Sequence, residues 1–205
     1  MTGGFGSEES LPKDFEPYLP PLVSFEGDCY RCDERLCEGG RYAALNDCDI
    51  LKPAMMHVVL YQPEIPPNTG NIARQCVGMD SCLHLIKPIG FDLSKSAVRR
   101  AGLDYWDELK LTVHESPDAF LGWLGKREPW LVTRYGSLRY DKPDYRKEEV
   151  LIFGSETKGL PQNWLERWPE RTLYVPILGK IRNYNLSNTV SVVLAHAILK
   201  AGIYG

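Results

Sequence analysis

Three polar loops contain the side chains of this sequence that are best suited to chemistry. The first, residues 63–74, follows a short apolar segment, and Pro66 and Pro67 restrict its backbone. Asn68 is placed to cap the helix that follows, because its side-chain oxygen can accept from free backbone N–H groups. Arg74 lies off the apolar stripe of that helix. An arginine near a helix start suits phosphate binding, although a solvated surface arginine is the plainer interpretation.

The second loop, residues 151–161, joins an apolar run to a helix that is expected to begin at Pro161. Gly154 ends the run, and Gly159 allows a tight return of the chain. Glycines at such a point would let a ligand approach the backbone without meeting a Cβ atom. The spacing matches neither the P-loop nor the dinucleotide-binding fingerprint. An ordinary strand–turn–helix junction therefore explains this loop equally well.

The third loop, residues 175–188, leads into the last helix and carries four hydrogen-bonding side chains. These are Arg182, Asn183, Asn185 and Ser187. For Asn185 and Ser187 taken singly, capping of the helix is the simpler role. Residue types and spacing thus indicate a ligand site near three loops, but they do not indicate a reaction.

These loops need a scaffold that brings them together, and the alternation of apolar runs with helical patterns predicts one. Several runs lack polar alternation, which is typical of strands buried on both faces of a parallel sheet. Open α/β sheets bind ligands beyond the carboxyl ends of their strands. We therefore predict a Rossmann-like, mostly parallel α/β sheet flanked by helices. The expected strands are His57–Tyr61, Cys82–Lys87, Leu109–Val113, Trp130–Thr133, Val150–Phe153 and Thr172–Pro176.

Helical signals lie between these strands. Residues 116–118 read Ser-Pro-Asp, which combines an N-cap, a first-turn proline and an acidic side chain. A short basic helix is expected from Ser94, ended by Gly102. The clearest helix follows the third loop, where apolar residues recur on one stripe between positions 186 and 201.

The composition is that of an ordinary globular protein, with 43% hydrophobic and 25% charged residues among 205. No apolar run approaches the roughly 20 residues that a membrane helix requires, so no membrane partner is expected. Residues 1–54 hold 11 acidic and 5 basic side chains, whereas residues 55–205 hold 16 and 19. A mildly basic body fits a polyanionic partner, but a mixed solvated surface fits as well.

Residues 1–54 are predicted to be an acidic, partly disordered extension of a domain that spans residues 55–205. The extension lacks the features of a secretory signal and of a mitochondrial presequence, so a cytoplasmic location is the default.

Six cysteines are divided between the two parts of the chain. Those of the extension are Cys29, Cys32, Cys37 and Cys48. The first two resemble half of a zinc site, but the spacing of the others is irregular, so free thiols are the simpler interpretation. Cys76 and Cys82 lie in apolar surroundings and are expected to be core residues.

Taken together, the three loops resemble the three sequence motifs of SPOUT methyltransferases. Residues 85–88 (Leu-Ile-Lys-Pro) and 99–105 (Arg-Arg-Ala-Gly-Leu-Asp-Tyr) add to the likeness, which extends from about Met56 to Tyr204. The subgroup that it resembles most is the small one that methylates the ribose of the wobble nucleotide in certain tRNAs. Three long motifs in the proper order form a specific signal.

The resemblance implies a C-terminal trefoil knot, a homodimer, and S-adenosylmethionine bound in the knot, with no metal. It implies that Val132, Gly154 and Val175 line the cofactor, largely through backbone groups. Glu156 matches a carboxylate of the second motif, and Asn183 lies where the family contacts the cofactor.

The resemblance also implies the residues that serve the reaction. Asn68 and Arg74 match the first-motif pair associated with ribose chemistry, and we expect Asn185 to join them as a catalytic residue. Arg182 and Ser187 match third-motif positions near the cofactor and the tRNA. Because a guanidinium rarely deprotonates, we expect Arg74 to orient the substrate and stabilise the developing alkoxide rather than act as a base.

The chain departs from this family at two adjacent positions. Asn183 stands where relatives usually have serine, and Tyr184 stands where they have an aliphatic residue. We predict an enzyme that transfers a methyl group from S-adenosylmethionine to a ribose 2′-hydroxyl of tRNA. Two alternatives stay open: a catalytically silent RNA-binding relative, suggested by Asn183, and a nucleotide-binding α/β protein of another kind.

Overall fold

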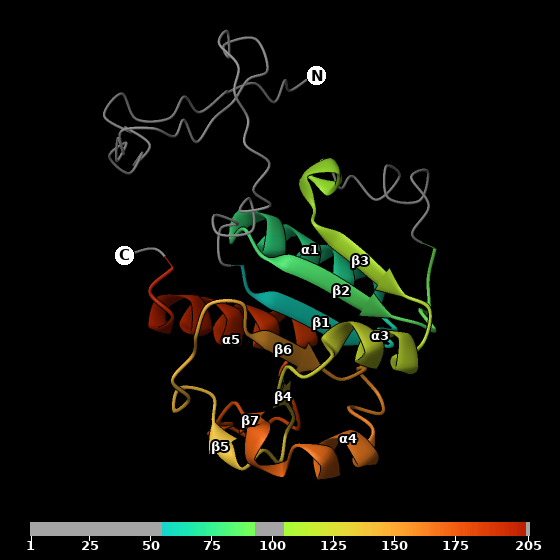
Figure 1. Ribbon diagram of the computed structural model, residues 1–205. Coiled ribbons are helices and arrows are strands. Elements are labelled where there is room, and N and C mark those ends of the chain that lie inside the picture. The colour runs from blue at the N-terminus through green and yellow to red at the C-terminus, as the bar shows by residue number, and fades with distance from the viewer. Residues whose placement is uncertain (1–54, 93–104, 204–205) are drawn as a thin grey trace, which may run out of the picture. The chain divides into compact units, whose positions relative to one another are not determined.

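Seven parallel strands form one sheet in the computed structural model, which describes residues 55–92 and 105–203 (Figure 1). The spatial order is β3-β2-β1-β6-β4-β7-β5, and every pair of neighbours is parallel. The strands are β1 His57–Tyr61, β2 Cys82–Ile86, β3 Leu111–His114, β4 Trp130–Val132, β5 Leu138–Arg139, β6 Val150–Phe153 and β7 Thr172–Tyr174.

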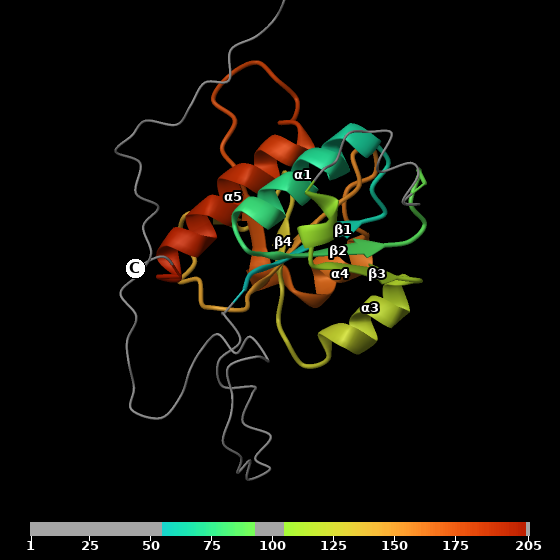
Figure 2. The ribbon, with the colours of Figure 1, turned by 90° about the horizontal axis from the view of Figure 1, so that it is seen from above.

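Helices cover both faces of this sheet. In the part of the chain that the structure describes, the α-helices are α1 Pro66–Gly78, α3 Pro117–Leu124, α4 Gln162–Arg167 and α5 Leu186–Lys200, and the short 3₁₀ turns are η2 Trp106–Glu108 and η3 Pro169–Arg171. Figure 2 shows α1 and α5 side by side on one face, with α3 on the opposite face. In the described ranges, no helix combines the length and the apolar character that crossing a membrane requires.

The apolar core is divided by the sheet, because successive residues of a strand point to opposite faces. Val58 and Leu60 of β1 belong to a buried cluster with Ile72 of α1 and Val193 of α5. Val59, between them, belongs to a second cluster with residues of α3 and α4. Both faces of the central strands are therefore covered.

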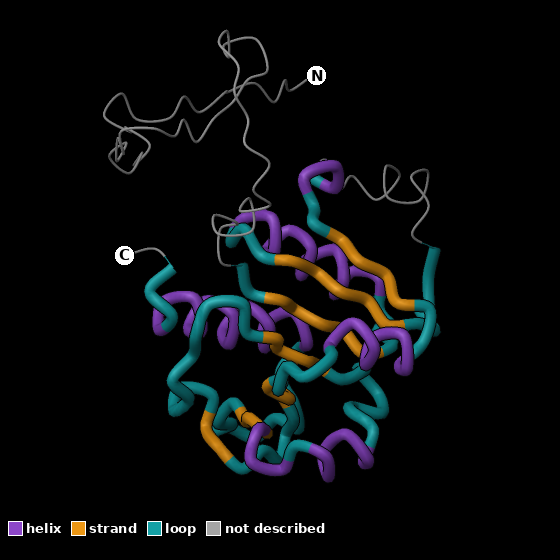
Figure 3. The backbone as a smooth tube through the Cα atoms, viewed as in Figure 1, coloured by secondary structure: helices purple, strands orange, loops and turns teal. Residues whose placement is uncertain are grey.

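The order of the strands explains how distant loops meet. β6 lies between β1 and β4, although β4 comes earlier in the chain, and β7 lies on the other side of β4. Because all these strands are parallel, the loops that follow β1, β4, β6 and β7 leave from the same carboxyl edge. The tube in Figure 3 shows these loops between the ends of strands and the helices.

The predicted parallel α/β sheet is confirmed. β1 and β6 have the expected bounds, and the bounds of the other four predicted strands differ by one or two residues. β5 was not predicted, because it has only two residues and both are exposed. Cys76 is a core residue as predicted, whereas Cys82 at the start of β2 is only half-buried. The basic helix expected between Ser94 and Gly102, and the extension with its four cysteines, lie outside the described residues.

Three histidines form a hydrogen-bonded row across β1, β2 and β3. Nδ1 of His57 lies 3.0 Å from Nε2 of His84, and Nδ1 of His84 lies 3.1 Å from Nε2 of His114. Trp123 of α3 covers them, with its ring centre 4.2 Å from that of His84. Burial, aided by the charge of Arg127, lowers the pKa of His57 to about 4. Burial also lowers the pKa of His84 to about 3, and the charges of the other two histidines and of Arg127 lower it in the same direction. The row is therefore neutral at pH 7, and each ring can donate one hydrogen bond and accept another.

This row predicts an acid-sensitive stability. Because the folded pKa values lie below the ordinary 6.5, the unfolded chain takes up protons first as the pH falls. The free energy of unfolding should be highest above about pH 6.5 and should decrease toward pH 4 by on the order of 3 kcal/mol for each of these two histidines. Urea unfolding at a series of pH values measures this change in the free energy of unfolding. In a His84→Phe variant the decrease should be smaller, and an equal decrease in both proteins would contradict the assignment.

Candidate functional site

Asn68 is the centre of a hydrogen-bond network that joins the three loops. Its side-chain nitrogen donates to Oε1 of Glu156 at 2.9 Å, and its side-chain oxygen accepts from the side-chain nitrogen of Asn185 at 2.9 Å. Asn68 is buried, with 5% of its surface exposed. The loops after β1 and β6 and the loop before α5 are thus connected through one amide.

The expectation that Asn68 caps the first helix was wrong. The helix begins two residues earlier, at Pro66, and its N-cap residue is Ile65, which has no side-chain cap. Asn68 therefore lies inside the first turn, where its amide is free to bond Glu156 and Asn185. The local sequence could not reveal this, because both partners belong to other parts of the chain.

Glu156 supplies the cap that the first helix lacks locally. Its carboxylate accepts from the backbone nitrogen of Glu64 at 2.9 Å and of Ile65 at 3.3 Å, in addition to Asn68. The two prolines that follow have no N–H group to satisfy. A carboxylate at a helix N-terminus is also favoured by the helix dipole. Thr157 adds a second link, since its hydroxyl donates to Oε1 of Glu64 at 2.7 Å.

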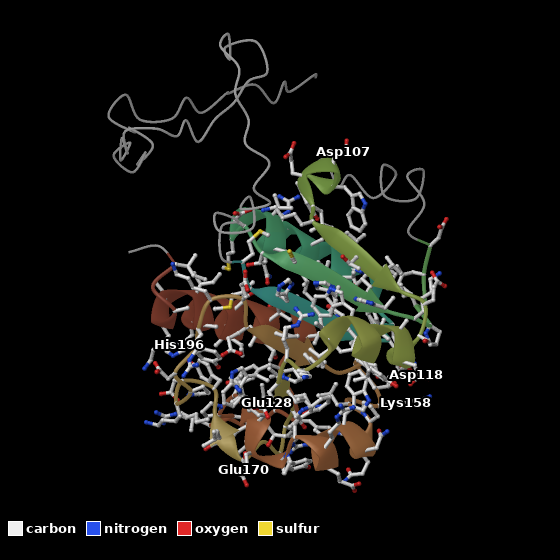
Figure 4. The ribbon with its side chains drawn as sticks, viewed as in Figure 1. Asp107, Asp118, Glu128, Lys158, Glu170 and His196 are labelled. Atoms are coloured by element: carbon white, nitrogen blue, oxygen red, sulfur yellow. The ribbon has the colours of Figure 1, made fainter. Side chains whose placement is uncertain are left out.

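The loop that carries Glu156 is closed by its glycines. Ser155 and Gly159 exchange backbone hydrogen bonds of 3.2 and 3.0 Å, and Gly159 has a φ of 70°, which favours glycine. Gly154 lies against the closed loop: a Cβ added to it would lie 2.3 Å from the carbonyl carbon of Gly159. We expected the lack of a Cβ at Gly154 to make room for a ligand, but the backbone of Gly159 occupies that space. In Figure 4, Lys158 of this loop lies at the same end of the sheet as Asp118, which follows β3.

Asn185 connects the network to the last helix. It is the N-cap of α5, and its Oδ1 accepts from the backbone nitrogen of Ser187 at 2.8 Å and from the Ser187 hydroxyl at 2.7 Å. Capping, the simpler role predicted for Asn185, is confirmed. The side-chain nitrogen is then left to reach Asn68, so one residue both starts the helix and holds the site.

The three residues expected beside a cofactor lie at neighbouring strand ends. Val132 ends β4 and pairs with Phe153, the residue before Gly154, and with Leu173 of β7, two residues before Val175. A hollow of about 610 Å³ adjoins Val175. Apolar, aromatic and polar side chains line it, among them Val175, Pro176, Leu178, Tyr184, Asn188 and Thr189.

A charged pair lies at the rim of this hollow. Arg139 donates to both carboxylate oxygens of Asp141, at 2.5 and 2.6 Å, and these hydrogen bonds hold the pKa of Asp141 at about 2. Arg139 ends β5, the strand that was not predicted, and Asp141 follows it. A ligand in the hollow would meet a neutralised pair rather than a free charge.

Arg74 does not join the network. It lies six residues after Asn68 in α1, about 9 Å along the helix axis and about 120° around it. Its side chain is exposed, as predicted, and its guanidinium carbon lies 4.6 Å from the ring centre of Tyr105. The sequence did not single out Tyr105 as a site residue, since nothing local relates it to Arg74.

The remaining third-loop residues are exposed. Arg182 and Asn183 form no hydrogen bond with the described residues, whereas the hydroxyl of Tyr184 donates to the carbonyl of Pro176 at 3.2 Å. Tyr184, one of the two departures noted in the sequence, thus closes the loop between residues 176 and 184. Asn183, the other departure, leaves its side chain free for a ligand.

The fold is that of a parallel α/β protein in which three polar loops meet at the carboxyl edge of the sheet, the edge where such sheets bind ligands. The chain belongs to the SpoU rRNA Methylase family, whose model matches residues 55–195.

Methyltransferases from several bacteria are similar to most of the chain. It is 44% identical over 150 residues to a putative RNA (cytidine(34)-2′-O)-methyltransferase of Lactobacillus gasseri, which covers 71% of this chain and 81% of the relative. It is 42% identical over 144 residues to a tRNA (cytidine(34)-2′-O)-methyltransferase of Methylovorus glucosotrophus, covering 70% and 94%. A solved structure concerned with 2-OH methylation of C/U34 on tRNA is 39% identical, with a TM-score of 0.68 and coverage of 74% and 99%.

The close approach at Gly154 predicts a position that tolerates no side chain. Gly154→Ala should lower the free energy of unfolding by about 1–3 kcal/mol, because the added methyl group overlaps the backbone of Gly159. Gly122→Ala is the matched control, since it lies in α3 with nothing within 4 Å of the added carbon. That change should be neutral or stabilising by up to about 1 kcal/mol. Equal unfolding curves for wild type and Gly154→Ala would contradict this geometry.

Proposed function

We propose that this protein transfers a methyl group from S-adenosylmethionine to a ribose 2′-hydroxyl of tRNA, at the anticodon wobble nucleotide and in the cytoplasm. The observation that carries the proposal is the network of Asn68, Glu156 and Asn185, which brings three motif loops together at one sheet edge. Membership of a methylase family supports the same reaction, as do the activities named for relatives that match more than two thirds of the chain.

The cofactor site proposed here consists of the strand ends at Val132, Gly154 and Val175. Ligand sites of nucleoside size are concave, mainly apolar and provided with a few polar groups. The hollow beside Val175 has these properties, with Tyr184 as an aromatic wall and Asn188 as a polar group. Of the residues expected at the cofactor, Val175 lines this hollow, and Glu156 and Asn183 belong to loops at the same edge, which supports a fit to S-adenosylmethionine.

Bound S-adenosylmethionine would supply an electrophilic methyl group, and the protein's task is then positioning. The network fixes the amides of Asn68 and Asn185 through partners on both sides, so that they meet the ribose without rearranging. Arg74 carries a positive charge that can bind a phosphate and stabilise the alkoxide as the hydroxyl proton passes to solvent water. Arg182, which is exposed, is proposed to contact the tRNA. Ser187, which was expected to do the same, is buried and donates its hydroxyl to Asn185, so it supports the start of α5 instead. No metal is needed for this chemistry.

A knotted homodimer is part of the proposal. β6 is inserted between β1 and β4, and α5 then returns to pack beside α1, an order that supports a threaded chain. Leu178 and Val192 are exposed to 97% and 42%, and a second copy would cover them. In such a dimer, the face of α1 that carries Arg74 would meet the carboxyl edge of the partner's sheet. Arg74 does not reach that edge in its own chain.

We also propose that residues 1–54 are an appendage of a methyltransferase domain at residues 55–205. The family model begins at residue 55, which supports this division. Free thiols at Cys29, Cys32, Cys37 and Cys48 are preferred over a zinc site. Stoichiometric zinc in the purified full-length protein would overturn that preference.

Methyl transfer to tRNA separates an active enzyme from a silent RNA-binding relative. Wild type should transfer labelled methyl groups from S-adenosylmethionine to deproteinised tRNA, and mass spectrometry should locate them on the wobble ribose. Asn183→Ala should lower the rate, since an amide near the ligand is lost, whereas Asn183→Ser should remain active. An inert wild type that becomes active as Asn183→Ser would identify a silenced relative instead.

Removal of the Arg74 charge should affect the reaction and not the fold. Arg74→Ala should change the free energy of unfolding by less than about 1 kcal/mol, as exposed positions usually do. The rate of methyl transfer should fall at least about tenfold, because the alkoxide loses a stabilising charge. Thermal unfolding and single-turnover methylation measure the two effects. Full activity, or a protein that no longer folds, would contradict the role given to Arg74.

A further inference from the structure

The guanidinium of Arg74 is held by its face and not by its N–H groups. It stacks over the ring of Tyr105 at 4.6 Å, and its N–H groups form no hydrogen bond with any residue that the structure describes. Arg127 provides a contrast. It stacks on Trp123 at 3.8 Å but also donates to the backbone carbonyls of Trp123 and Leu124, so its donors are used within the fold.

Tyr105 is itself fixed to the turn of α1 that carries Arg74. Its hydroxyl donates to the carbonyl of Gly70 at 2.7 Å. In an α-helix that carbonyl also accepts the backbone N–H of the residue four positions later, which is Arg74. The ring is half-buried against the core on the α1 side of the sheet, together with Trp106 of η2. The phenol is therefore held at both ends, by a hydrogen bond and by packing.

We propose that Tyr105 is a positioning residue for Arg74. This inference rests on the proposed methyl transfer and adds a residue to it. Stacking restricts the long arginine side chain to one arrangement and leaves the donors in the guanidinium plane directed outward. Those donors are the ones that a phosphate or a developing alkoxide requires. A shift of about 1 Å in such a group can cost on the order of a hundredfold in rate.

Two substitutions separate the ring from the hydroxyl. Tyr105→Leu removes the platform and should lower kcat for methyl transfer about tenfold or more, while the affinity for S-adenosylmethionine stays within about twofold. Tyr105→Phe keeps the ring and should retain kcat within about threefold. Leu124→Ala, in the core on the opposite face of the sheet, is the control for loss of stability alone. Its kcat should equal that of wild type wherever the protein remains folded.

A double-mutant cycle gives the decisive result. If Tyr105 acts through Arg74, Tyr105→Leu in an Arg74→Ala background should cause no further loss of kcat, whereas independent losses should multiply. Multiplied losses, or a Tyr105→Leu enzyme with wild-type kcat, would overturn the inference.

The same cycle distinguishes this inference from the proposed function. A wild type without methyltransferase activity would contradict the proposed function alone. In that case the affinity of the single and double variants for tRNA would be measured instead. The effects of the Arg74 and Tyr105 substitutions on this affinity should again be non-additive. Additive effects on that affinity would overturn the positioning role by itself.

Discussion

The hydrogen bond from Asn185 to Asn68 connects the last helix of the chain to the first, and the geometry of the site depends on it. A primary amide suits this place because it donates and accepts at once. Asn68 gives its nitrogen to Glu156 and receives Asn185 on its oxygen, so neither group can be replaced by a carboxylate or a hydroxyl without losing a partner. Glu156 and Asn185 each also satisfy a helix terminus. The interactions that start α1 and α5 are therefore the same ones that assemble the site.

This arrangement separates two tasks between the faces of α1. The buried face, with Asn68, fixes the loops before a ligand binds. The exposed face presents Arg74 on the ring of Tyr105, with its donors free. Preorganised polar groups are effective because they need no rearrangement when charge develops. The histidine row lies on the α3 side of the sheet, against Trp123, and is separate from this network.

Much of the scaffold could be predicted from the sequence. Apolar strands without alternation indicate a parallel sheet, and the three polar loops do meet at its carboxyl edge. Asn185 was correctly interpreted as a cap. The roles of Asn68 and Gly154 were misjudged, because the partners of each lie outside the local pattern: Glu156 is 88 residues from Asn68, and the backbone at Gly159 meets Gly154 only after the loop closes. The stack of Arg74 on Tyr105 was missed for the same reason. The assignment of a reaction came from resemblance to a family and not from spacing.

The affinity for S-adenosylmethionine in a double-mutant cycle of Glu156→Ala and Asn185→Ala tests most directly whether one network holds the cofactor loops. Both changes break the same chain of hydrogen bonds through Asn68. Calorimetry should therefore give a clear loss of affinity for each single variant and little further loss for the pair, because coupled groups are non-additive. Unchanged affinity in all three variants, or losses that simply add, would contradict a site assembled by this network.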